Sequence, residues 1–294
     1  MLAEIGLEPQ RNLVDKVAPP PVLPMNVDEN TQISRFQARA RNYVSRGNYS
    51  GAETYLLAAL RSARLRAPDR LSLWNDLGMV YKYLGKFAKA RELYRHALCG
   101  APNHLNGAER DFFLADLYHN LGGLEHARRH FRRGERFARK GLQLRRRVAS
   151  SRSLPVAVDM AALAALLDGQ KRFDESERLY RQALRIYRRV YGPSHGETAI
   201  LLSNLAALCQ ATGRSKTSME YYRRALKMKL QKFGSSHPSV ALTLNNLGML
   251  YRTLGKTRQA KQCLAAALRI LHYFGPRHFQ YKAIKRNYQI VSAP

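Results

Sequence analysis

Histidines recur at nearly regular intervals in the second half of this sequence. His195, His237 and His278 each follow a glycine by three residues, and similar spacings separate them from one another. Imidazole nitrogens can bind a metal or carry a proton. If each histidine belongs to its own pair of stacked helices, however, neighbouring rings lie roughly 15–20 Å apart, too far to share an ion. We therefore interpret these histidines as turn and helix-cap residues.

Sequence motifs of the common catalytic sites are missing. There is no G-x-x-x-x-G-K-[ST], G-x-S-x-G or H-E-x-x-H motif. The acidic segment 174–177 is typical of a first helical turn, where the helix dipole favours carboxylates. Cys99, Cys209 and Cys263 are far apart and form no C-x-x-C pair, which predicts small buried hydrophobic residues. The sequence thus predicts a protein that is not an enzyme and binds no metal or other cofactor.

Two adjacent asparagines, Asn245 and Asn246, interrupt an otherwise good helix. Leu244, Leu247 and Tyr251 form the apolar face of this helix at the spacing i, i+3, i+7, and the asparagines lie away from it. An amide offers a hydrogen-bond donor and an acceptor together. We therefore expect these side chains to face water or a bound partner.

The helices that position these residues belong to an internal repeat. Two sets of residues recur at intervals of 42: Leu163, Leu205 and Leu247, and Ala183, Ala225 and Ala267. Each unit reads as two amphipathic helices joined by a turn. A shorter unit precedes them, with large and small residues at fixed positions: Trp74, Leu77, Gly78, Tyr81, Ala90, Tyr94, Ala97 and Pro102.

On these residues, the chain resembles the tetratricopeptide-repeat (TPR) proteins. Its 42-residue units are similar to the kinesin light chain subtype, whose Gly-Pro-x-His-Pro-like turn corresponds here to 192–195 and 234–238. The resemblance implies an all-α fold, a right-handed α-solenoid of about six helical hairpins with a C-terminal capping helix.

The order of these units predicts the domains. We expect a disordered, proline-containing tail at 1–30, repeats 1–3 at 31–147, and a linker or hinge at 148–156. Repeats 4–6 then cover 157–278, and a capping helix with the C-terminus covers 279–294. Small residues at one position of each helix let the two helices of a hairpin approach closely. In the third repeat we assign these positions to Ala115 and Ala127, which makes the step to the fourth repeat a longer, 49-residue one.

The resemblance also implies a binding groove on the concave side, lined by the first helix of each hairpin. In relatives, asparagines at the positions of Asn204 and Asn246 hold a peptide backbone. The predicted groove residues are Asn75, Lys82, Asn204, Gln210, Asn245, Asn246, Met249 and Arg252. The other residues expected in the same groove are Gln37, Arg41, Asp76, Met79, Asp116, His119 and Asp168.

The net charge of +29 is extreme for 294 residues. It leaves two interpretations of the basic second helices open. They form a solvated convex face, or they bind phosphate groups or an acidic protein surface. The predicted basic surface consists of Arg128, Arg129, Arg132, Arg133, Arg136, Arg223, Arg224 and Lys227. We expect Lys229 on the same outer, convex side.

The sequence contains no stretch of about 18 apolar residues, so we expect no membrane span. Its first residues lack the pattern of a secretory signal, which favours the cytoplasm. The predicted function is a non-catalytic scaffold or adaptor that binds a peptide or protein, acidic by charge complementarity. The alternative is a nucleic-acid-associated protein that binds RNA or DNA through its basic helices. The oligomeric state stays open.

Overall fold

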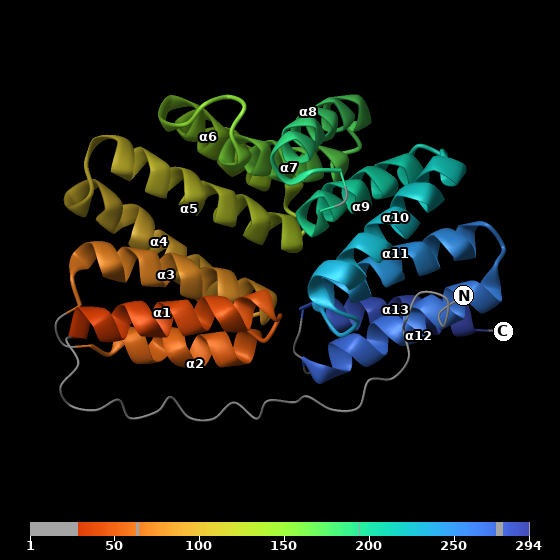
Figure 1. Cartoon of the computed structure of the whole chain (residues 1–294), viewed down its shortest axis with the longest axis horizontal. Coiled ribbons are helices and arrows are strands. Elements are labelled where there is room, and N and C mark those ends of the chain that lie inside the picture. The colour runs from red at the N-terminus through yellow and green to blue at the C-terminus, as the bar shows by residue number, and fades with distance from the viewer. Residues whose placement is uncertain (1–28, 63–64, 194, 275–278, 294) are drawn as a thin grey trace. The chain divides into compact units, whose positions relative to one another are not determined.

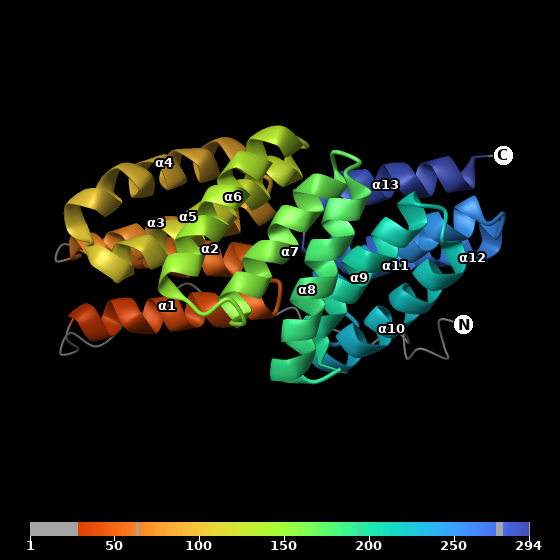
Figure 2. The same cartoon turned by 90° about the horizontal axis from the view of Figure 1, so that it is seen from above.

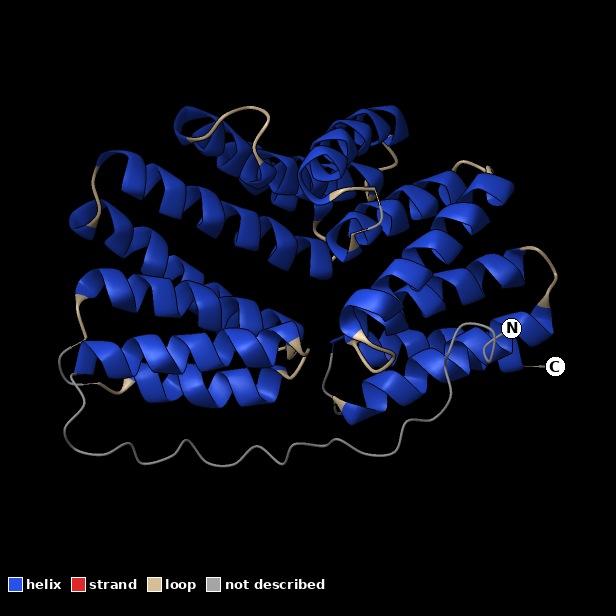
Figure 3. Ribbon diagram, viewed as in Figure 1, coloured by secondary structure: helices blue, strands red, loops and turns tan. Residues whose placement is uncertain are grey.

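The computed structural model describes residues 29–293, except 63–64, 194 and 275–278. The described residues form thirteen helices and no strand, so the predicted all-α fold is confirmed (Figure 3). Between Ala149 and Ser150 the chain divides into an N-terminal and a C-terminal unit. Most of the predicted tail lies outside the described residues, but its last two residues, Glu29 and Asn30, begin the first helix.

The N-terminal unit consists of three antiparallel hairpins in which each helix packs against the next (Figure 1). A hairpin's first and second helices are its members in chain order. The helices are α1 (Glu29–Ser45), α2 (Tyr49–Leu60), α3 (Ala67–Tyr83), α4 (Phe87–His104), α5 (Gly107–Ala127) and α6 (Phe131–Val148).

The C-terminal unit repeats this arrangement and adds one helix. Its helices are α7 (Leu154–Asp168), α8 (Phe173–Tyr191), α9 (Gly196–Ala211), α10 (Ser215–Phe233), α11 (Pro238–Thr253), α12 (Thr257–Tyr273) and α13 (Phe279–Ser292). Helices α7 and α11 each have a proline in the first turn, where a backbone N–H has no partner within the helix and its loss costs no helical hydrogen bond. The last helix, α13, lies against α11 and α12 (Figure 2).

The turn between the two helices of every hairpin contains one residue with a positive φ, in the left-handed backbone conformation. This residue marks the register of the repeat. These residues are Gly47, Gly85, Arg129, Lys171, Gly213 and Gly255. The last four follow one another at a constant interval, which is that of the 42-residue repeat. This period therefore includes the third hairpin, and the predicted longer step before the fourth is wrong.

The third hairpin is shifted by seven residues from its predicted register. Ala127 ends α5, the first helix, instead of lying inside the second. The close contact is made by Gly122, where an added Cβ would lie 3.5 Å from Ala138 Cβ and from Gly134 O. Because seven residues make nearly two helical turns, Ala115 lies on the same face of α5 and fits a one-dimensional pattern equally well.

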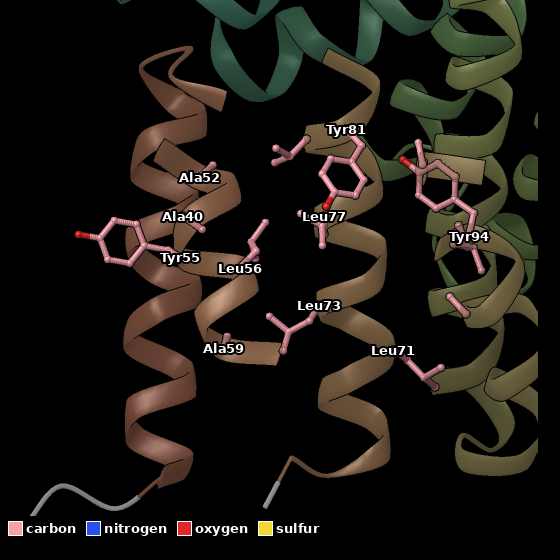
Figure 4. Close-up of a cluster of buried hydrophobic side chains, with 14 of the residues drawn as sticks. Ala40, Ala52, Tyr55, Leu56, Ala59, Leu71, Leu73, Leu77, Tyr81 and Tyr94 are labelled. Carbon is pink, nitrogen blue, oxygen red and sulfur yellow. The ribbon is translucent and has the colours of Figure 1, made fainter. Parts of the chain in front are cut away.

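Small residues are needed where the two helices of a hairpin cross. A Cβ on Gly78 would lie 2.5 Å from the Tyr94 ring, so any larger side chain there would displace the ring. On the second helices α8 and α10, serines occupy the crossing position. Ser176 and Ser218 donate hydrogen bonds to backbone oxygens of the facing first helix at 2.8 and 2.7 Å. Figure 4 shows the resulting core of the N-terminal unit, with Tyr94 on the side of α3 away from α1 and α2.

Two further predictions need correction. Cys209 and Cys263 are buried as expected, but Cys99 is exposed on α4. The segment between α6 and α7 comprises only residues 149–153, since Val148 still belongs to α6 and α7 begins at Leu154. A hinge in this segment stays a prediction.

Candidate functional site

The first helices of the hairpins form one continuous face within each unit. The main contacts between non-consecutive helices join α3 with α5, α7 with α9, α9 with α11, and α11 with α13. All of these are first helices except α13, which follows α11 as the next first helix would. We call the side of each unit formed by these helices its inner face, and the predicted groove residues belong to its helices α3, α9 and α11.

Asn204 presents an amide that the described residues leave without a hydrogen-bond partner. It is half-buried on α9, and no hydrogen bond joins its side chain to another residue in the described part of the chain. One repeat later, Asn246 accepts a hydrogen bond from Asn245 Nδ2 at 3.1 Å. It also lies beside the hydroxyl of Tyr222. Burial and the charge of Asp168 raise the pKa of this hydroxyl, and the Asn246 amide offsets only part of the rise. Because Asn204 and Asn246 are one repeat period apart and α9 contacts α11, the two amides lie at equivalent positions on neighbouring first helices.

Asn245 has a structural contact that the sequence did not reveal. Its Oδ1 accepts a hydrogen bond of 2.9 Å from Asn287 Nδ2 on α13. A matching contact exists in the N-terminal unit, where Asn120 Nδ2 donates to Asn75 Oδ1 at 2.9 Å. In both units, this pair of amides joins two helices of the inner face. Asn75 and Asn245 stay predicted groove residues, with one acceptor already in use on each.

Asn120 is an amide of the inner face that sequence analysis missed. The shifted register put Asp116 and His119 on the inner face of α5 but left out Asn120. The signal was present, because Asn120 precedes Asn204 by two repeat periods and Asn246 by three. A register fixed by the turn residues would have found it.

The inner face of the N-terminal unit carries both signs of charge. Burial raises the pKa of Asp76 to about 6, Asp116 adds to this effect, and Arg41 opposes it. Lys82, a predicted groove residue, lies with its Nζ 4.6 Å from the centre of the Tyr83 ring and close to Gly123 of α5. In the C-terminal unit, Gln210 and Met249 are half-buried and Arg252 is exposed.

The predicted basic surface is only partly free. Buried Glu125 gathers four cationic or basic side chains around its carboxylate, at distances of 2.8 to 3.8 Å: His130, Arg91, Arg128 and Arg133. On α10, Arg223 donates to Tyr251 Oη and Arg224 to the Pro193 carbonyl. By contrast Arg129, Arg132, Arg136 and Lys227 are exposed, and no ion pair joins them to the residues that the structure describes.

Lys229 is not solvated, contrary to the prediction. Only 4% of it is exposed. Its Nζ donates to Thr243 Oγ1 at 2.8 Å and to Ser203 Oγ at 3.0 Å, so hydroxyl groups replace a counterion. Burial lowers the pKa of Lys229 to about 7.

Two of the three recurring histidines, His195 and His237, cap helices as predicted. The Nδ1 of His195 accepts a hydrogen bond from the Glu197 backbone at 3.3 Å, and the Nδ1 of His237 accepts one from Ser239 at 3.1 Å. Each therefore satisfies a backbone donor at the start of a helix. His278 lies outside the described residues.

Over the described ranges, no cluster of histidine, cysteine and acidic side chains has the arrangement of a metal site. The helices described there include none with the length and apolar character of a membrane span.

Comparisons with known proteins agree with this architecture. Family models described as "Tetratricopeptide repeat" match residues 71–98, 114–153, 156–231 and 220–271. A search of curated proteins gave no match.

Solved structures show the same fold at low sequence identity. BtubC (BKLC) from P. vanneervenii is 21% identical, with a TM-score of 0.53 over 83% of this chain and 91% of that one. A variant protein from Podosopora anserina, described as "putative kinesin light chain nearly identical TPR-like repeats", is 18% identical, with a TM-score of 0.51 over 71% and 97%. The Rap protein complexed with Competence and Sporulation Factor is 12% identical, with a TM-score of 0.62 over 90% and 76%.

Proposed function

We propose, since the chain belongs to the tetratricopeptide-repeat family, that it is a non-catalytic scaffold that binds a peptide or protein partner on its inner face. The observation that carries this proposal is the open amide of Asn204, aligned with Asn246 on the neighbouring first helix. Two amides at a fixed spacing can each donate to and accept from a peptide backbone.

The partner is acidic in this proposal. The net charge of +29 produces a strongly positive field, and no acidic residue follows Glu220. Such a field speeds association with an acidic partner and weakens as salt screens it. The proposal also includes a location in the cytoplasm, which imaging of a tagged chain would test.

The experiment is the double substitution Asn204→Ala and Asn246→Ala, with binding measured by fluorescence titration against a library of acidic peptides. We expect the affinity for wild-type binders to fall at least about tenfold, since each lost hydrogen bond contributes roughly 0.5–1.5 kcal/mol. Gln262→Ala, which removes an exposed amide from α12, is the matched control and should leave affinity unchanged. If the double variant binds the peptides as tightly as wild type does, the proposal that Asn204 and Asn246 hold a bound peptide is wrong.

A second candidate function rests on Arg132 and Arg136 of α6. Both are exposed and have no carboxylate partner among the described residues, so they are free to contact phosphates. In this alternative, the basic second helices bind RNA or DNA and the inner face is not required.

A further inference from the structure

The inner face of the C-terminal unit carries exposed aliphatic side chains at one repeated position. We define the aliphatic row as Val158, Ile200 and Leu242, which lie on α7, α9 and α11 at the interval of the 42-residue repeat. Val158 is 37% exposed and Ile200 41%, and Leu242 is half-buried. Large aliphatic residues exposed in register on neighbouring helices favour an apolar partner surface.

The amides lie between this row and a second apolar row. Two further rows are defined by their distance along each helix from the residue of the aliphatic row. The residues four positions later make up the amide row, and the residues seven positions later make up the floor row. These positions share one helix face. The amide row consists of Ala162, Asn204 and Asn246, and the floor row of Ala165, Ala207 and Met249. The amides could therefore hold a backbone whose side chains contact apolar groups on both sides.

A fourth row, ten positions after the first, changes charge from one end of the groove to the other. It consists of Asp168 on α7, Gln210 on α9 and Arg252 on α11. No ion pair or side-chain hydrogen bond joins Asp168 to another described residue, and burial raises its pKa to about 6. Arg252 is exposed and likewise has no acidic partner in the described part of the chain. Each end of the row thus presents a charge that no described residue of opposite charge compensates.

We propose that the groove of the C-terminal unit has two charge subsites of opposite sign, joined by the apolar and amide rows. Asp168 takes a basic side chain or an amine of the bound segment, and Arg252 takes a carboxylate. Consecutive first helices of this unit contact each other directly, so one repeat step here is a single helix-to-helix distance of about 10 Å. Two steps from α7 to α11 therefore span about 20 Å, or roughly six residues of extended chain. This inference rests on the proposed function. It concerns the seated segment, whereas the overall acidity of the partner acts over a longer range.

The test is a set of binding cycles on the full chain with labelled, end-blocked peptides. Each peptide carries one lysine and one glutamate, separated by about three to about eight alternating valines and threonines. The lysine or the glutamate is then replaced by glutamine, and all peptides are titrated against wild type, Asp168→Asn and Arg252→Gln. Arg258→Gln, an exposed arginine of α12, serves as the control.

We expect replacement of the peptide lysine to lower affinity about three- to tenfold in wild type and to have no effect in Asp168→Asn. Replacement of the glutamate should lower affinity in wild type and have no effect in Arg252→Gln. The crossed combinations should show no coupling, and the best spacer should be about five residues, as the span between the two end helices requires.

Equal affinity of all peptides for wild type would overturn the proposal, as would a lysine effect that persists in Asp168→Asn. If library peptides bind in an asparagine-dependent way but none of this set binds, the charge subsites fail and the proposed function stands. If the double asparagine variant binds library peptides as wild type does, the proposed function itself fails.

Discussion

At the scale of single residues, the environment decides what a charge does. Lys229 and Arg145 occupy equivalent positions two repeat periods apart, and both are buried. Arg145 pairs with Asp116 and lies 4.5 Å from the centre of the Phe112 ring. Among the described residues, Lys229 has only hydroxyl and carbonyl acceptors. Burial without a carboxylate disfavours its charged form.

The consequence for Lys229 is a stability that depends on pH. Its pKa is about 7 when folded and about 10.4 when unfolded. Between these values the unfolded chain binds more protons, so the free energy of unfolding rises as pH increases from about 7 to about 10. We expect Lys229→Met to stabilise the protein at pH 7 and to flatten this rise. Urea unfolding across that pH range would check it.

The exposed neighbour Lys227 provides the control for this measurement. Lys227→Met should leave the pH dependence of stability as in wild type. If Lys229→Met proved destabilising at pH 7, or kept the full pH dependence, the amine would not be desolvated in the folded protein.

At the scale of helices, the turn residues fix which side chains meet. Arg129 ends the turn of the third hairpin, so α5 must extend to Ala127 and Gly122 must face α6. The same rule places Gly248 of α11 against Leu264 and the Ala260 carbonyl of α12. Each hairpin tolerates only small residues at these crossing points, since larger ones would force the helices apart.

Substitutions in the third hairpin distinguish the two registers. Gly134 is buried in α6 next to Gly122, so Gly134→Leu should destabilise the protein by roughly 1–3 kcal/mol through overpacking. Ala127 is only half-buried, and Ala127→Leu should have a much smaller effect. Gly248→Leu should resemble Gly134→Leu. Thermal unfolding of the three variants measures the difference, and the opposite ranking of Gly134 and Ala127 would restore the predicted register.

At the scale of the whole molecule, positive charge is spread over both units. Residues 29–149 contain 24 lysines and arginines against 10 acidic residues, and 150–294 contain 24 against 7. The field therefore attracts any polyanion, and its long range alone does not select nucleic acid over an acidic protein.

Charge reversal at Arg132 and Arg136 separates the two partners. If the second helices bind nucleic acid, Arg132→Glu with Arg136→Glu should weaken binding of labelled random RNA and lower its salt dependence by about two phosphate contacts. Peptide binding in the groove should change little. Reversal at exposed Lys282 and Lys285 of α13 has the same net charge and is the control. If both variants lose the same affinity for RNA, the net positive charge attracts RNA and α6 forms no specific binding site.

Sequence alone determined the helical hairpins, the 42-residue period and the position of Asn204 and Asn246 on one face. It could do so because helix periodicity and close helix packing restrict residue types at fixed spacing. Tertiary structure decided the register of α5, the burial of Lys229 and the contact between Asn245 and Asn287. Each depends on which residues of another helix lie opposite. A pattern read along one helix repeats nearly every seven residues and does not record the neighbour that covers it.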